Sequence, residues 1–288
     1  MRTRLKHPVL VDRICFVIVC LFSVIALTPF IILVFELFKR GFKQFNWDFF
    51  TETAPGSVEA MLAQIGGHPV TGGIVNGIYG SLAVILIAVG FAVPIGIFAG
   101  IYIYEKQTCK LSTAVQYAGI ILKGTSSVIV GLVAYLWISL FFDHSPVLAG
   151  GLSLTILLLP SIIQSTWHTL LSIPENLKES GFALGASYSN VWFQIILPSV
   201  RKPLLSRILT SSTPIVGSTA PLIIAVLGSS AINRDVDNSA TTLSLLIWRF
   251  FNHPNMVDLM WGASLFLFLI VVMLNLINRH LKKNRHEK

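Results

Sequence analysis

Six runs of about 20 apolar residues constrain the fold of this chain more than any other feature. A backbone inside lipid has no water to bond, so it must satisfy its own hydrogen bonds, and about 20 helical residues cross the hydrocarbon. Only 12% of the residues are charged and 54% are hydrophobic, whereas a soluble domain is about 25% charged. We therefore expect an all-α polytopic membrane protein with six transmembrane helices, at Ile14–Phe35, Ser81–Tyr104, Gly124–Phe142, Val147–Thr166, Ile208–Leu227 and Leu259–Ile277.

The distribution of positive charge predicts the orientation of these helices. The first apolar run follows a basic start and is longer than the roughly 7–15 residues of a signal-peptide core, which indicates an uncleaved anchor. With the N-terminus inside, 15 of the 21 lysines and arginines fall on the inner side, in agreement with the positive-inside rule. We expect a multi-pass protein of the cell inner membrane, with both termini cytoplasmic and a basic cytoplasmic tail at 281–288. The net charge of +8 then reflects orientation and anionic membrane lipid, and implies no nucleic acid.

The polar residues show no pattern of a catalytic or metal centre. Cys15, Cys20 and Cys109 have neither a zinc spacing nor a disulfide pattern, and the histidines are scattered without an HExxH motif. A GxxxxGK[ST] phosphate loop is also missing from the sequence. We therefore expect no catalytic residue, metal or cofactor in this chain. If ATP drives the protein, another chain holds the nucleotide.

Two polar stretches are longer than a connector needs to be. The first, residues 36–75, contains the aromatic group QFNWDFF, which is typical of a membrane-interface anchor followed by a solvated loop. The N-terminal region 1–75 is thus an anchor helix with an external loop, and a core of five helices follows at 76–280. The second stretch, residues 167–203, lies on the inner side between the fourth and fifth spans.

The inner stretch first shows the signals of a short helix. Ser172 and Glu175 have the spacing of a capping box, and Pro174 suits a first helical turn. Gly181 and Gly185 lie four residues apart, so they share a helix face that a partner can approach closely, and Gly185 also fits the end of the helix.

A second helix is expected directly after the first. Ser187 or Ser189 is placed to cap it, and Pro198 is placed to interrupt it. Such a compact hairpin suits docking into another protein. An amphipathic hairpin that lies on the membrane surface explains the residues equally well.

Residues 174–198 resemble the EAA loop of ABC importer permeases, whose pattern is E-A-A-x3-G-x9-I-x-L-P. The matching positions are Glu179, Gly181, Gly185, Ile195, Leu197 and Pro198, with Ser180 and Gly181 in place of the two alanines. The resemblance implies the type I ABC importer permease fold with a cytoplasmic coupling helix hairpin. It also implies that this hairpin enters a groove on a cytoplasmic ATPase and transmits its closure to the membrane helices.

Further segments are similar to the phosphate importer permeases of the PstA type. They are GGIVNGIYGSL at 72–82, VPIGIFAGIY at 93–102, SSVIVGL at 126–132, the Leu-Pro pair at 159–160 and GSTAPLI at 217–223. The resemblance implies ATP-driven import of inorganic phosphate, with this chain forming half of the pathway. It further implies a second permease of the PstC type, two ATPase subunits of the PstB type and an external phosphate-binding protein of the PstS type.

Three positions depart from that family pattern. Ser126 replaces a proline, Gln164 an arginine and Ser218 a glutamate. An arginine fork is the usual ligand of phosphate, so the loss bears on the cargo. Either the two charges were lost together and the partner permease supplies the anion contacts, or the cargo is another oxyanion or a phosphonate.

Residues with hydroxyl groups mark a candidate substrate pathway. The fifth span reads TSSTPIVGSTAPLII, and interrupted membrane helices are tolerated where they line a cavity or pack on protein. Small-residue packing against a neighbouring helix is an equal alternative. Lys123 is expected to be a snorkelling anchor at the cytoplasmic edge. The pathway candidates are Thr125, Ser126, Ser127, Gln164, Ser218 and Thr219.

Two other classes of function compete with an ATP-driven permease. An ion-coupled transporter needs ionisable residues within its spans, and these spans contain almost none, which argues against it. A non-transporting ABC membrane scaffold would keep the hairpin without the hydroxyl-rich fifth span, and the missing charged pair leaves this alternative open.

Overall fold

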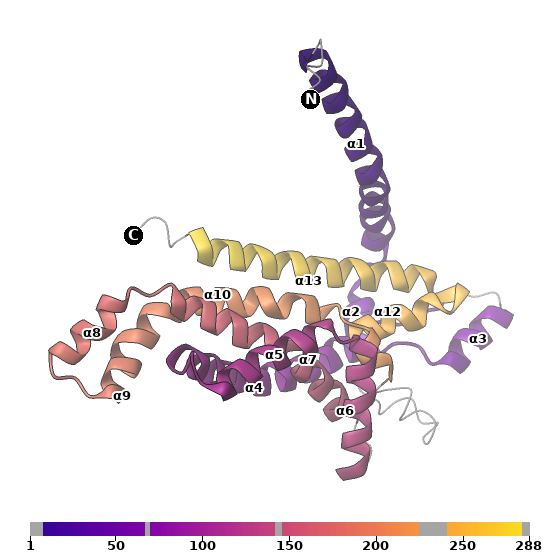
Figure 1. Cartoon of the computed structure of the whole chain (residues 1–288). Helices are drawn as coiled ribbons and strands as arrows, with labels where there is room; N and C mark the ends of the chain where they lie inside the picture. The colour runs from indigo at the N-terminus through magenta and orange to yellow at the C-terminus, as the bar shows by residue number, and fades with distance from the viewer. Residues whose placement is uncertain (1–7, 67–69, 142–145, 225–240, 284–288) are drawn as a thin grey trace.

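The computed structural model describes residues 8–66, 70–141, 146–224 and 241–283, and these residues form helices joined by turns and short connections (Figure 1). This confirms the predicted all-α class. The long helices are α1 (Pro8–Gly41), α4 (Val75–Glu105), α5 (Lys110–Gly124), α6 (Ser127–Phe141), α7 (Pro146–Leu171), α10 (Leu197–Val216) and α13 (Val257–Lys283). The short ones are η1 (Phe42–Gln44), α2 (Trp47–Thr51), α3 (Ser57–Gly66), α8 (Glu175–Ala183), α9 (Tyr188–Asn190), η2 (Val191–Ile196), α12 (Leu243–Phe251) and η4 (Pro254–Met256).

The described residues contain four helices that are long and apolar enough to cross a membrane. They correspond to the predicted first, second, fourth and sixth spans. A fifth span is present if α5 and α6, which meet at an angle of 108°, are counted together. The structure therefore agrees with a multi-pass membrane protein and differs from the sequence prediction at the third and fifth spans.

The third predicted span is longer and sharply bent. It was expected to begin at Gly124, but the helix α5 already runs from Lys110 to Gly124 and α6 follows from Ser127. Thr125 connects the two with extended backbone angles (φ −77°, ψ 139°), which cannot continue a helix. As a consequence, the expected cytoplasmic connector beyond Lys110 is helical, and Lys123 lies a full helix length beyond the turn at 106–109.

The fifth predicted span is divided rather than continuous. The helix α10 starts eleven residues before Ile208, includes Arg201, Lys202 and Arg207, and ends at Val216. A new helical stretch occupies 220–224, and the last three residues of the predicted span lie outside the described residues. The break follows Pro214 and includes Gly217, two residues that weaken a helix at this point.

The helices α4 and α7 form the centre of the bundle and run in the same direction. Gly96 and Gly100 of α4 face Ile162 and Thr166 of α7, and a Cβ added at either glycine would lie 2.6 Å from its neighbour's side chain. At the other end of the pair, Gly151 of α7 faces Ile87 of α4 at a similar separation. Small residues thus let the two backbones approach closely, as is typical of membrane helices.

Polar contacts join the remaining core helices. Ser165 of α7 and Ser211 of α10 share a hydrogen bond of 3.0 Å. On its other side, α10 meets Asn278 of α13, whose amide bonds the hydroxyls of Ser206 and Thr210. Since Asn278 is 6% exposed, these bonds satisfy a polar group that would otherwise be costly in an apolar core.

The aromatic group of residues 44–50 packs partly against the protein core, which the interface-anchor interpretation did not predict. Phe49 is 3% exposed and lies in a core cluster with Ile74, Leu246 and Phe250, and Phe50 contacts the ring of Phe266. The helix α2 explains the difference, because it directs these rings towards α12 and α13. Among the aromatic residues of this group, only Trp47, at 82% exposed, has a fully exposed ring.

The helix α1 projects away from the other long helices (Figure 1). Its apolar side chains are exposed over most of its length, and burial begins only near Leu37. At that end Phe38 contacts the ring of Phe268 of α13, with centroids 6.0 Å apart. A helix that is apolar on all sides needs lipid or protein around it, which supports the predicted anchor role.

Replacing Gly100 with alanine tests the close packing of α4 and α7. The new methyl group has no space beside Thr166, so the substitution should lower the free energy of unfolding by about 1–3 kcal/mol. Thermal unfolding of the purified protein in detergent measures the loss. The control is Gly90→Ala in the same helix, where nothing lies within 4 Å of the added Cβ, and equal effects of the two substitutions would contradict this packing.

Candidate functional site

The predicted hairpin begins with α8, but not through the predicted capping box. The helix starts at Glu175 after Pro174, and no side chain caps it. The Ser172 hydroxyl instead donates to the Thr169 carbonyl at 2.6 Å. Ser172 follows directly on α7, where free carbonyls are available, and these compete successfully for its hydroxyl.

The end of α8 is built around Gly185. Its φ of +76° lies in the left-handed region that favours glycine. The Gly185 N–H donates to the Phe182 carbonyl at 2.9 Å, and the Ala186 N–H donates to the Gly181 carbonyl at 3.3 Å. These two bonds form a Schellman motif. The prediction that Gly185 ends the helix is confirmed. Since α8 ends at Ala183, the prediction that Gly185 shares a face of this helix with Gly181 is wrong.

Gly181 serves packing within the hairpin. It is buried, and a Cβ there would lie 3.0 Å from Ile195 Cδ1 and 3.1 Å from Val191 Cγ2. The small residue therefore lets α8 lie close against η2. Glu179, two residues earlier, is exposed.

The second half of the hairpin continues into α10 without a break. The Ser187 hydroxyl accepts from the Asn190 N–H at 3.4 Å, which confirms the predicted cap. The π-helical turn η2 then leads directly into α10, with Pro198 in its first turn. Pro198 thus does not interrupt the helical path, in which the π-helical turn directly precedes α10.

The base of the hairpin is apolar and buried, and its tip is apolar and exposed. Trp192 and Ile196 pack with Leu170 of α7 in a core cluster, and Ile195 and Leu197 border it. At the tip, Leu184 is 88% exposed. Phe182 stacks on Tyr188 with ring centroids 6.4 Å apart, and both rings remain exposed. The hairpin, which contains α8 and α9, occupies the end of the bundle opposite α3 (Figure 1).

The turn after α4 carries a cysteine with altered acidity. The N–H of Leu111 at the start of α5, followed by the Tyr102 hydroxyl, lowers the pKa of Cys109 from its ordinary value, although burial acts in the opposite direction. The cysteine is free and partly exposed.

The structure places the pathway candidates in two groups. Thr125, Ser126 and Ser127 form the bend between α5 and α6, and the Thr125 hydroxyl donates to the Ile121 carbonyl at 2.9 Å. Ser218 and Thr219 follow α10, where the Ser218 carbonyl accepts from the Ser244 hydroxyl at 3.4 Å. Within the described part of the chain, no hydrogen bond joins the two groups directly.

Most hydroxyls of α10 are already engaged. Thr210, Ser212 and Thr213 donate to carbonyls of their own helix at 2.8–2.9 Å, and Ser211 bonds to Ser165. These bonds support the packing interpretation for α10. The pathway interpretation then rests on the candidates outside α10, which lie at the bend between α5 and α6, in α7 and after α10.

Gln164 lies beside the charge of Lys123. Its Oε1 accepts a hydrogen bond from Lys123 Nζ. Gln164 is seven residues before the end of α7, or about 10 Å along the helix. Lys123 thus lies beside α7, and its role as a snorkelling anchor stays a prediction. The amphipathic pattern of residues 110–124 was the signal that could have predicted the helix α5.

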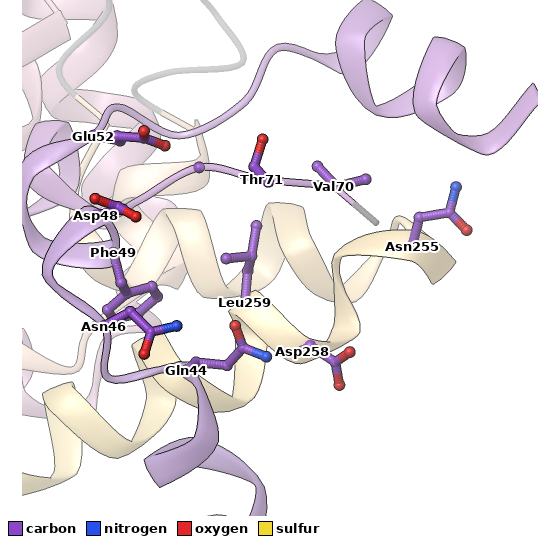
Figure 2. A pocket seen from close by; sticks show the side chains of 11 residues that line it. Gln44, Asn46, Asp48, Phe49, Glu52, Val70, Thr71, Asn255, Asp258 and Leu259 are labelled. Atoms are coloured by element: carbon purple, nitrogen blue, oxygen red, sulfur yellow. The ribbon is translucent and has the colours of Figure 1, made fainter. Parts of the chain in front are cut away.

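A polar pocket of about 420 Å³ lies at the opposite end of the molecule from the hairpin. Figure 2 shows that residues from α2, the segment 70–72, η4 and α13 surround it. Its lining includes Asp48, Glu52 and Asp258, and none of the lining residues carries a positive charge. Such a pocket repels an anion, so we assign no phosphate contact to it.

No family model matches the chain, but curated proteins and solved structures do. The phosphate transport system permease protein PstA 1 of Mycobacterium tuberculosis (strain CDC 1551 / Oshkosh) is 30% identical over 257 residues, which cover 88% of this chain and 82% of that protein. The phosphate transport system permease protein PstA of Pasteurella multocida is 27% identical, with 86% and 85% covered.

Solved ABC transporters share the fold at low sequence identity. A chain of the MetNI methionine ABC transporter in an inward-facing conformation has a TM-score of 0.58 and 18% identity, over 73% of this chain and 95% of that one. A chain of an amino acid ABC transporter crystallised with histidines has a TM-score of 0.51 and 12% identity, over 80% of this chain and 100% of that one. Together with the relatives above, these likenesses show that the chain belongs to the PstA family of phosphate transport system permease proteins.

Proposed function

We propose that this chain is the permease subunit of an ATP-driven importer of inorganic phosphate and forms half of its translocation pathway. The observation that carries the proposal is its similarity to PstA proteins along most of both chains. The chain itself performs no chemistry on the cargo. ATP is hydrolysed by a separate pair of cytoplasmic ATPase subunits of the PstB type.

The hairpin is the proposed docking element for that ATPase. Its exposed apolar tip, with Leu184, Phe182 and Tyr188, is costly to leave in water and suits burial in a groove of another protein. Its base packs on α7 and continues into α10, so a movement of the tip reaches the membrane helices. The matching EAA positions Glu179, Gly181, Gly185, Ile195, Leu197 and Pro198 belong to this unit.

The remaining partners and the orientation follow from the same proposal. A second permease of the PstC type completes the pathway, and an external phosphate-binding protein of the PstS type delivers the anion. The hairpin and both termini lie in the cytoplasm, and the protein resides in the cell inner membrane. The excess of lysine and arginine on that side supports this orientation.

Lys123 bears on the choice of cargo. A charged residue within a membrane span is usually functional, and this lysine contacts Gln164, the position where the family pattern has an arginine. The positive charge is thus displaced to the neighbouring helix rather than lost. This favours an anionic cargo over a non-transporting scaffold, with Gln164 and Thr125 beside the lysine in the pathway.

Uptake of radiolabelled phosphate tests the proposed function. Cells that lack this chain should take up little phosphate through the importer, and restoring the chain should restore uptake that excess unlabelled phosphate blocks. Sulfate, molybdate and a phosphonate serve as competitors. Restored uptake that one of these blocks more strongly than phosphate would assign a different cargo. Failure to restore uptake with all partner subunits present would contradict the importer role.

The substitution Lys123→Met tests the anion contact. Hydrogen bonds to charged groups contribute about 1.5–3 kcal/mol, so we expect the KM for phosphate uptake to rise roughly tenfold or more. Lys123→Arg keeps the charge and should remain close to the wild type. An unchanged KM in Lys123→Met would remove this lysine from the pathway.

The substitution Gly185→Val tests the hairpin tip. A branched residue in the left-handed region costs about 1–2 kcal/mol, which corresponds to a factor of roughly 5–30 in the population of the native tip. Uptake should fall accordingly, while the amount of protein in the membrane stays the same. Gly185→Asn is the control, because asparagine tolerates this conformation. If both variants transport normally, the tip geometry does not matter for coupling.

A further inference from the structure

One ion pair connects the first helix of the hairpin to the bundle. Lys178 of α8 donates to Glu105 at the end of α4, with Nζ and Oε1 2.6 Å apart. The side chains are 28% and 18% exposed. Among the described residues, it is the one side-chain hydrogen bond or ion pair from α8 to another element.

The ring of Tyr104 supports this ion pair. The Lys178 ammonium lies 5.8 Å from the Tyr104 ring centroid, within the range of a cation–π interaction. The same ring meets Trp192 of η2 edge to face, with centroids 6.1 Å apart. The end of α4 therefore contacts both halves of the hairpin, one through charge and one through aromatic packing.

Several features favour a cation at this place. The last carbonyls of α4 give its end a partial negative charge, which adds to the attraction of the Glu105 carboxylate. Because both side chains are largely shielded from water, the attraction is screened less than at a free surface. Tyr104 further limits the positions that the lysine can adopt.

The helix α4 can pass on a displacement of its cytoplasmic end. It is a single helix of 31 residues, and Gly96 and Gly100 hold it close to α7. Ala92, farther along, packs with Leu204 and Ile208 of α10. A movement at Glu105 therefore shifts α4, which packs against both α7 and α10.

We propose that the Lys178–Glu105 ion pair is a positioning contact that makes α4 follow the coupling hairpin. Closure of the ATPase moves α8, the ion pair carries the end of α4 with it, and α4 shifts against α7 and α10. The proposal rests on the proposed function of the hairpin as the ATPase docking element. It assigns a role to two residues outside the matched EAA positions.

Charge exchange in the assembled importer tests the ion pair. The chain is reconstituted in vesicles with its partner permease, ATPase and binding protein, and phosphate uptake per ATP hydrolysed is measured. We expect Lys178→Glu and Glu105→Lys to assemble and hydrolyse ATP, but to lose roughly fivefold to tenfold in uptake per ATP, a range typical of coupled contacts. The double exchange should recover uptake to within about twofold. Lys106→Glu, an equal charge change next to Glu105, should have no effect.

A second measurement keeps this proposal separate from the identity of the cargo. Spin labels at Gly90→Cys on α4 and Met273→Cys on α13, two exposed positions, report the movement of α4 with no cargo present, in a chain whose native cysteines are replaced. ATP should change the distance in the wild type and in the double exchange, but not in either single exchange. A wild-type change without phosphate uptake would overturn the proposed cargo alone. Single exchanges that behave like the wild type, or a double exchange as defective as the singles, would overturn the ion-pair proposal.

Discussion

The close approach of α4 and α7 determines where the other parts of the protein can lie. Glycines at positions 96, 100 and 151 remove the side chains that would hold the two helices apart. Because the helices run in the same direction, their C-terminal ends lie together. The hairpin that follows α7 therefore returns beside the end of α4, where Glu105, Tyr104 and Leu170 meet it. The packing that stabilises the bundle thus also supplies the surface on which the hairpin is held.

Much of this architecture could be predicted from local sequence signals. A long apolar run has few alternatives to a membrane helix, so α1, α4, α7 and α13 could be placed from hydrophobicity alone. The end of α8 was also predictable, since a glycine at Gly185 and a serine at Ser187 act through their own backbone neighbourhood. The match of the hairpin residues to the spacing of the EAA pattern is likewise a local feature of the sequence.

The errors arose where distant contacts decide the structure. Residues 110–124 are too short and polar to be recognised as a span by themselves, and the hydrogen bond from Lys123 to Gln164 joins residues 41 positions apart. The error at Ser172 was local: its hydroxyl could accept from the Glu175 N–H or donate to a carbonyl of α7, and it donates to Thr169. The aromatic group was judged by its composition, although Phe49 is held by residues some 200 positions away in the sequence, such as Phe250. The partners Lys178 and Glu105 lie 73 residues apart, and no local pattern links them.

The continuous helical path from α9 through η2 into α10 has a consequence for torsion. A helix resists twisting about its own axis, and α10 extends over about 30 Å from Leu197 to Val216. A rotation of the hairpin therefore arrives at Val216 as a rotation, at the point where the chain breaks before Ser218. Such a rotation changes which side chains of α10 face Ser165 and Asn278.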